Sequence, residues 1–139
     1  MFKRMLIAND GSEGASRALS KAVALAREHS AELHMICVEE LPKFPATVDE
    51  VVEEKLEANH RFEAVIARAN ALAQAEGVSL TSHVVVGHAV PTIVDFVQRE
   101  GFDLLIVGFM GHSALYNRLI GSTTDRLVEL APCAVLVVK

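Results

Sequence analysis

The stretch of sequence that decides the fold spans residues 102–130 and reads FDLLIVGFMGHSALYNRLIGSTTDRLVEL. Its residues 104–107 are a run of apolar side chains that does not alternate with polar ones, as is typical of a strand covered on both faces of a sheet. A loop with three glycines follows, and residues 123–130 then show a short helical pattern that stops before Pro132. A buried strand, a glycine-rich loop and a helix in this order indicate an α/β protein.

The rest of the chain repeats this alternation of short apolar runs and longer segments with helical period. We predict four more strands, at residues 5–8, 33–38, 80–86 and 134–138. We predict three more helices, at residues 13–28, 48–76 and 91–100, the last of them opening at Pro91. Strands that alternate with helices pair in parallel, because each right-handed crossover lays its helix on a face of the sheet. The sequence therefore predicts one domain over residues 1–139, a doubly wound, Rossmann-like α/β fold whose five parallel strands have the order 3-2-1-4-5, with helices on both faces.

Composition and charge exclude several classes of protein. The 139 residues are 51% hydrophobic, and a chain of this length buries enough surface to fold without disulfides or a structural metal. The formal net charge of −5 argues against binding to nucleic acid or to an anionic membrane, because both favour basic surfaces. Residues 47–57, with five acidic side chains and one lysine, carry −4 of this charge, and we interpret them as the solvated face of a helix.

The two cysteines and the apolar runs suggest a location. Cys37 and Cys133 form neither a CxxC motif nor the Cys/His spacing of a zinc site, so we expect two buried thiols. No apolar run approaches the roughly 20 residues of a membrane span, and the N-terminal run is too short for a signal peptide. We expect a cytoplasmic protein that binds neither membranes nor nucleic acid.

Doubly wound sheets bind ligands beyond the carboxyl ends of their strands, where the strand order reverses. With the first strand in the centre, the loops to inspect are residues 9–12 and the segment that begins at Gly108. That segment contains Gly108 and Gly111 and ends in Gly-Ser-Thr-Thr, residues 121–124, at the start of a helix. Glycines allow close approach of the backbone, and helix N-termini attract phosphate, so the pattern indicates a phosphate site. The alternative is that the glycines only turn the strand and the hydroxyls only cap the helix.

The same residues resemble the nucleotide-binding signature of the universal stress protein family, Gly-x2-Gly-x9-Gly-Ser, which is matched by Gly108, Gly111, Gly121 and Ser122. The likeness covers nearly the whole chain, and its further matching segments are residues 9–12, 102–108 and 131–138. The resemblance implies an adenine nucleotide alpha hydrolase-like fold, a homodimer, the binding of ATP or of AMP or ADP, and a role in stress or energy-state signalling.

The resemblance also implies roles for individual residues. Asp10 would bind the ribose hydroxyls, since a carboxylate accepts two such donors. Val38, at the end of its strand, would offer backbone groups to adenine, and Ala8 and Val107 would line the base pocket. The phosphates would be held by Gly108, Gly111, Gly121, Ser122 and Thr123. Any Mg²⁺ would be held chiefly by the phosphates, so no metal ligand is assigned. For Asp10 the alternative is an Asx turn within its loop.

The chain departs from the family pattern between the first two glycines. Many relatives carry a small hydroxyl residue and then a basic or His residue there, whereas this chain has Phe109 and Met110. Backbone contacts to phosphate would survive this change, but a cation would be missing. We consider His112 and Arg118 as sources of positive charge, and each is equally explained as a solvated side chain of the loop.

Other functions of doubly wound folds lack their residues here. A response-regulator receiver needs an Asp that ends the third strand and a Lys that ends the fifth, and a thioredoxin-like enzyme needs CxxC. No nucleophile–base pair or P-loop Lys is evident, so we predict no catalytic residue and at most slow ATP hydrolysis. His88, at the carboxyl end of a strand, is expected at the surface or as a helix cap. Two hypotheses remain: a nucleotide-binding sensor and regulator, or a nucleotide-independent regulatory dimer with a vestigial pocket.

The last strand, residues 134–138, suggests how a dimer would form. It would lie at an edge of the sheet, and an exposed apolar edge is a liability unless it is covered. We therefore predict a homodimer in which this strand pairs antiparallel with its copy across a twofold axis. The sequence does not identify a downstream protein partner.

Overall fold

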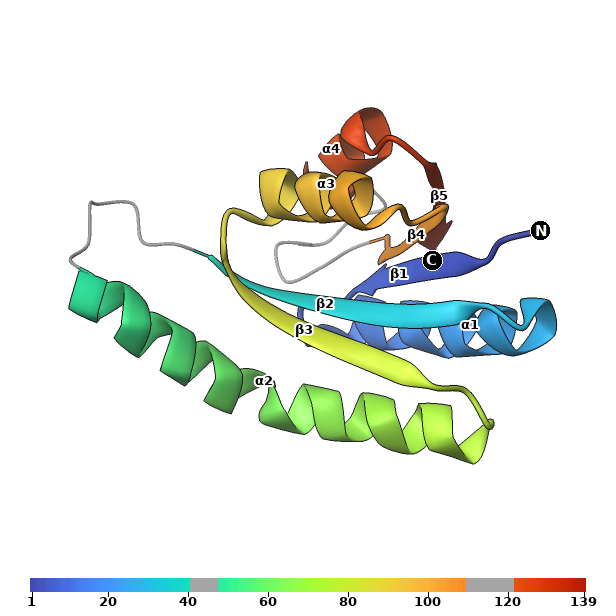
Figure 1. Cartoon of the computed structure of the whole chain (residues 1–139), viewed down its shortest axis with the longest axis horizontal. Helices are drawn as coiled ribbons and strands as arrows, with labels where there is room; N and C mark the ends of the chain where they lie inside the picture. Colours follow the sequence, from blue (N-terminus) through green and yellow to red (C-terminus); the bar gives the residue numbers. More distant parts are fainter. Residues whose placement is uncertain (41–47, 110–121) are drawn as a thin grey trace.

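The computed structural model describes residues 1–40, 48–109 and 122–139. These residues form a five-stranded sheet with helices packed on both faces (Figure 1). The strands are β1 (Arg4–Ala8), β2 (Glu32–Glu40), β3 (Leu80–Gly87), β4 (Leu104–Gly108) and β5 (Ala134–Val138). The helices are α1 (Glu13–His29), α2 (Val48–Ala75), α3 (Ala89–Glu100) and α4 (Ser122–Leu130).

Neighbouring strands of the sheet pair in parallel, in the order β3-β2-β1-β4-β5. The predicted fold class and strand order are thereby confirmed. β1 is central, because Met5 pairs with Leu33 of β2 on one side and with Leu104 of β4 on the other. The strand order reverses at β1, so the carboxyl ends of β1 and β4 lie side by side at one edge of the sheet.

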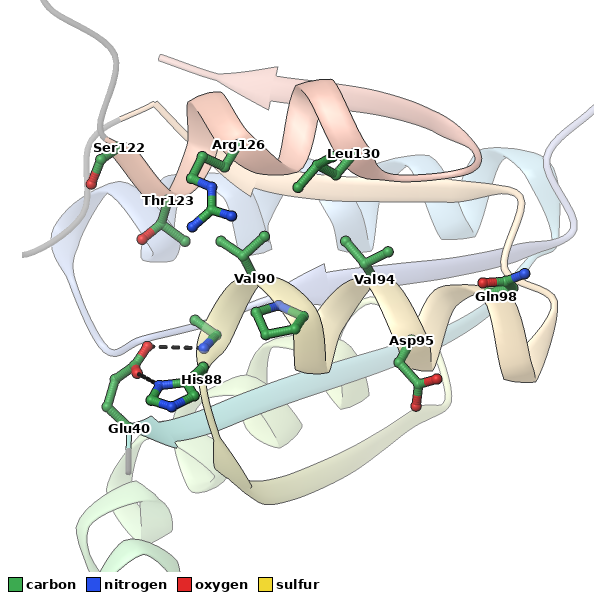
Figure 2. Close-up of a pocket in the computed structure, with 12 residues that line it drawn as sticks. Glu40, His88, Val90, Val94, Asp95, Gln98, Ser122, Thr123, Arg126 and Leu130 are labelled. Atoms are coloured by element: carbon green, nitrogen blue, oxygen red, sulfur yellow. Dashed lines mark hydrogen bonds and ion pairs between the residues drawn. The ribbon is translucent and has the colours of Figure 1, made fainter. Parts of the chain in front are cut away.

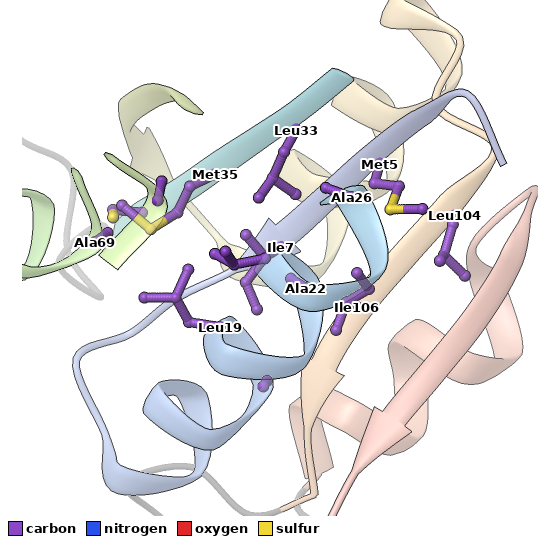
Figure 3. Packing of buried hydrophobic residues seen from close by; sticks show 14 of the residues in the cluster. Met5, Ile7, Leu19, Ala22, Ala26, Leu33, Met35, Ala69, Leu104 and Ile106 are labelled. Carbon is purple, nitrogen blue, oxygen red and sulfur yellow. The ribbon is translucent and has the colours of Figure 1, made fainter. Parts of the chain in front are cut away.

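The core consists of two layers, one on each face of the sheet. On one face Met5 and Ile7 pack in a cluster with Ala22 of α1 and with residues of α2 (Figure 3). On the other face Leu6 packs in a cluster with Ile93 of α3 and Leu127 of α4. Successive residues of a strand point to opposite faces, and both faces of β1 are covered, so all three of its central side chains are fully buried. Double coverage explains why the apolar runs do not alternate with polar residues.

The differences from prediction lie at the ends of elements. β2 extends to Glu40, two residues beyond the predicted end at Val38, because its backbone pairs with β3 along this whole stretch. Val38 therefore lies inside the strand, and the prediction that it ends the strand is wrong. The strand continues because the backbone groups of the two acidic residues that follow still pair with β3. α3 begins at Ala89 rather than at Pro91. Pro91 lies in the first turn, where its missing N–H costs little.

The two cysteines differ in burial. Cys37 in β2 is buried, and burial raises the pKa of its thiol to about 12, with the negative charge of Asp10 as a further cause. Cys133 is only half-buried, because it lies just before β5 at the edge of the sheet. The prediction of two buried thiols is confirmed for Cys37 and wrong for Cys133. In the described part of the chain both are free thiols.

The surface of the described residues agrees with the expectation for the acidic segment. Asp49, Glu50 and Glu53, in the first turns of α2, are exposed, so these acids lie on the solvated face of a helix. None of the helices within the described ranges has the length and hydrophobicity needed to cross a bilayer.

The end of β4 packs directly on the first turn of α1. A Cβ on Gly108 would lie 2.8 Å from the backbone carbon and oxygen of Gly14 and 3.1 Å from the amide nitrogen of Ala15. These are backbone atoms, so no change of side-chain rotamer relieves the contact. Thr124 of α4 donates from its hydroxyl to the carbonyl of Gly108 at 2.7 Å, which ties a second helix to the same point. The absence of a side chain at Gly108 therefore lets β4, α1 and α4 meet.

A pair of histidines lies between the sheet and α3. His34 Nδ1 and His83 Nε2 are 2.9 Å apart, and His34 Nε2 lies 2.9 Å from an oxygen of Glu32. In this contact one ring nitrogen donates and the other accepts. Phe96 of α3 packs edge-on against His83. Burial, and secondarily His34, lowers the pKa of His83, while Glu100 acts in the opposite direction.

We predict that part of the folding stability is lost as the pH falls below about 6.5, the ordinary pKa of histidine. The folded protein holds the pKa of His83 below that value, so in acid the unfolded chain binds more protons and is favoured. Urea unfolding at about pH 7.5 and about pH 5.5 measures the effect. His83→Gln should reduce the difference between the two pH values, whereas His60→Gln, on the exposed surface of α2, should leave it unchanged. Equal pH dependence in wild type and His83→Gln would contradict the prediction.

Gly108→Ala should lower the free energy of unfolding by about 1–3 kcal/mol, the usual range for overpacking. The added methyl group meets the backbone of Gly14 at 2.8 Å, and neither chain segment is able to turn away. Gly87→Ala is the matched control, because its methyl group meets only the side chain of Thr92, which has other rotamers. Chemical unfolding of both variants should show the larger loss for Gly108→Ala, and the reverse order would contradict the proposed packing role.

Candidate functional site

A pocket of about 600 Å³ opens at the carboxyl edge of the sheet, over the ends of β1, β2 and β4. The first turns of α1 and α4 and three residues of α2 also line it. The predicted site residues that it brings together are Ala8, Asp10, Val38, Val107, Gly108 and Thr123. Ser122 lines a neighbouring groove instead. Gly111, His112 and Gly121 lie outside the described residues.

The loop between β1 and α1 is held by three hydrogen bonds from the backbone to side chains. The buried Asn9 accepts from the amide of Gly11 at 2.9 Å, and Asp10 accepts from the amide of Ser12 at 2.9 Å. Ser12 caps α1 by accepting from the amide of Ala15 at 3.1 Å. The Asx turn that the sequence left open for Asp10 is thus present. Its carboxylate is exposed on this fixed loop at the pocket, and ribose binding by Asp10 stays a prediction.

Glu40 is a pocket residue that the sequence reasoning missed. One carboxylate oxygen accepts from the amide of Ala89 at 2.9 Å, and the other lies 3.3 Å from Nδ1 of His88 (Figure 2). His88 occupies the N-cap position of α3, makes no capping bond with its own side chain, and is exposed, as predicted. The side chain of His88 does not cap α3, so another group is free to accept from the first amides of the helix. In the sequence, the acidic residue at the end of the predicted second strand was the signal for such a cap.

Helix α2 supplies one wall of the pocket, which the sequence also did not predict. Arg61, Phe62 and Val65 line it, and Arg61 forms an ion pair with Glu39 of β2. A Cβ on Gly11 would lie 3.4 Å from a methyl group of Val65, so α2 closely approaches the loop after β1. In sequence, residues 61–65 read as part of a long helix with no special motif. Their approach to the pocket follows from tertiary packing alone.

The charges on the pocket wall are unevenly distributed. Among the described lining residues the acids are Asp10, Glu39 and Glu40, and the cation is Arg61. Glu39 and Glu40 end β2, so negative charge gathers at the β2 side. The first turns of α1 and α4 lie at the other side of the pocket, where amide groups and the helix dipoles favour anions. The pocket therefore has an anion-attracting end and an acidic end.

A second hollow lies beside the pocket. It is a groove of about 720 Å³ between α3 and α4, lined by Val90 and Val94 of α3 on one side and by Arg126 and Leu130 of α4 on the other (Figure 2). Glu40, Ala89 and Thr123 are common to the groove and to the pocket. We assign the ligand site to the pocket, because ligands of doubly wound sheets bind at the carboxyl edge, where the strand order reverses.

Comparison with known proteins agrees with the fold and with the family resemblance. The model of the universal stress protein family matches residues 1–139. A universal stress protein of Thermus aquaticus is 34% identical over 143 residues, covering 100% of both chains. UspA from Lactobacillus plantarum superposes with a TM-score of 0.87 at 27% identity, covering 99% of this chain and 98% of that one. A universal stress protein crystallised in complex with cAMP superposes with a TM-score of 0.77 at 26% identity, covering 99% and 97%. The chain belongs to the universal stress protein family.

Proposed function

We propose that the protein binds an adenine nucleotide in the pocket at the carboxyl edge of the sheet. The observation that carries the proposal is the position of this pocket, over the ends of β1, β2 and β4 and against the first turns of α1 and α4. Its volume of about 600 Å³ lies in the range of small-molecule sites. The complex of a 26% identical family member with cAMP supports an adenine nucleotide as the ligand.

The charge distribution supports one orientation of the nucleotide. The phosphates would lie against the first turns of α1 and α4, where helix N-termini attract anions and Thr123 adds a hydroxyl donor. They would avoid the acidic end formed by Glu39 and Glu40. Asp10, between the two ends in the loop after β1, would accept from the ribose hydroxyls. The uncharged base would then occupy this β2 end, where Val38 and residues of α2 add apolar side chains to the acidic ones.

The regulatory part of the proposal is that nucleotide occupancy reports stress or energy state to a partner protein. ATP is the proposed ligand within the adenine nucleotides, with Mg²⁺ held by its phosphates and at most slow hydrolysis. The family model spans residues 1–139, which supports a single universal stress protein domain. The cytoplasmic location stays a prediction from the sequence. A nucleotide-independent regulatory dimer is the alternative, and binding measurements decide between the two.

Isothermal titration with cAMP, AMP and ATP, with and without Mg²⁺, should show binding to the wild-type protein. Asp10→Ala should weaken binding roughly ten- to hundredfold, because it removes hydrogen bonds from the ribose to a charged group. Asp95→Ala is the matched control, since Asp95 lines the groove between α3 and α4 instead of the pocket and pairs with Arg99. Mass spectrometry of the small molecules released from purified protein identifies any nucleotide that is already bound.

Two results would contradict this assignment. Absence of heat with all three nucleotides at millimolar concentration would favour the nucleotide-independent dimer. Unchanged affinity in Asp10→Ala, together with weaker binding in Asp95→Ala, would move the ligand from the pocket to the groove between α3 and α4.

The dimer is the second part of the proposal. β5 pairs with β4 along one side and is an edge strand of the sheet, and its side chains after Ala134 are half-buried valines and a leucine. Pairing of β5 with its copy, antiparallel across a twofold axis, would cover this edge. Multi-angle light scattering at micromolar concentration should give twice the chain mass of 15.0 kDa. A monomer mass at that concentration would contradict the dimer and leave the nucleotide site untouched.

A further inference from the structure

The wall that α2 contributes to the pocket contains an arginine, Arg61, to which the proposed nucleotide site gives no role. Arg61 is the cation among the described lining residues, and its side chain is 47% exposed, beside Phe62, which is 8% exposed. Arg61 forms an ion pair with Glu39, whose side chain is 22% exposed. A half-exposed arginine fixed by a largely covered acid at the rim of a pocket is placed to touch whatever enters it.

The part of the ligand that meets Arg61 follows from the charges around it. Anions are attracted to helix N-termini, but the N-terminus of α3 is already occupied by the carboxylate of Glu40, which accepts from the amide of Ala89. Because Glu39 is paired with Arg61, the β2 end of the pocket keeps the negative charge of Glu40, which repels phosphate. The phosphates therefore belong at the α1 and α4 side, and the uncharged base belongs at the end where Arg61 lies.

The surroundings of Arg61 suit a flat aromatic group. Phe62 and Val65 make the α2 wall beside Arg61 apolar, and Val38 lines the pocket from the α3–α4 face of the sheet. A guanidinium is planar, weakly hydrated and stacks on aromatic rings, and purines offer a larger face than pyrimidines. Glu39 pairs with Arg61 and holds the charged guanidinium in place, which limits the entropy lost when a base binds.

We infer that Arg61 covers the purine base by stacking its guanidinium on the ring, with Glu39 as the positioning residue that holds it there. Arg61 is then a binding residue that favours purines, supplied by a helix outside the glycine-rich signature. The inference rests on the proposed function, because it needs the base at the β2 end of the pocket.

The experiment compares adenosine, AMP, ATP and ribose 5-phosphate as ligands of the wild-type protein and three variants. Arg61→Ala should weaken binding of adenosine, AMP and ATP by a common factor of about 3 to 30, the range of a cation–π contact, and should leave ribose 5-phosphate unchanged. Arg61→Lys should lose a large part of the same affinity, because an ammonium group has no plane to stack. Arg68→Ala, exposed on the same helix away from the pocket and groove, is the control.

Each outcome separates this inference from the proposed function. Loss of affinity for ATP with adenosine unchanged would mean that Arg61 contacts phosphate, and it would overturn stacking on the base. Full affinity in Arg61→Lys would show that charge alone matters, which also overturns it. If the wild-type protein binds none of the adenine ligands, the proposed function itself fails. Thermal unfolding of each variant, which should match Arg68→Ala, identifies a loss of affinity caused only by unfolding.

Discussion

The parallel pairing of β1 with both β2 and β4 is the constraint on which the rest of the structure depends. Because β1 is flanked on both sides, it is buried on both faces, and its side chains divide between the α1–α2 layer and the α3–α4 layer. The same pairing makes the chain reverse its order of strands at β1. The carboxyl ends of β1, β2 and β4 consequently lie at one edge of the sheet, and the pocket opens there.

The pocket combines features with different structural origins. Its anion-attracting side consists of backbone amides at the start of α1 and α4, and these need close packing of helices on strand ends, which the bare backbone of Gly108 allows. Its acidic side consists of carboxylates at the end of β2, each engaged with a second element: Glu39 with α2 and Glu40 with α3. The two sides differ in charge, so an asymmetric ligand has one favourable direction. A nucleotide, with an anionic end and an aromatic end, has this asymmetry.

The sequence was most informative where physical chemistry acts locally. Unbroken apolar runs identified β4 and β5, helical period identified α1, and the alternation of the two predicted the parallel sheet and its order. The sequence was less informative where the end of a strand is set by pairing with a strand far away in the chain. The end of β2 was misplaced because it is set by pairing with β3, in which Glu40 lies opposite Gly87, a residue 47 positions further along the chain. The contact of α2 with the pocket was missed for a similar reason, because Arg61 carries no local signal.

By itself, the sequence determined the fold class, the strand order and the central position of β1. It also determined the glycine and hydroxyl positions that resemble the family signature, because periodicity and spacing are properties of neighbouring residues. Only the tertiary structure decided that Val38 lies inside its strand, that Gly108 is required by the backbone of α1, and that Glu40 caps α3. It also decided that α2 forms a wall of the pocket. These features depend on contacts between segments far apart in the chain, whose distances no local pattern encodes.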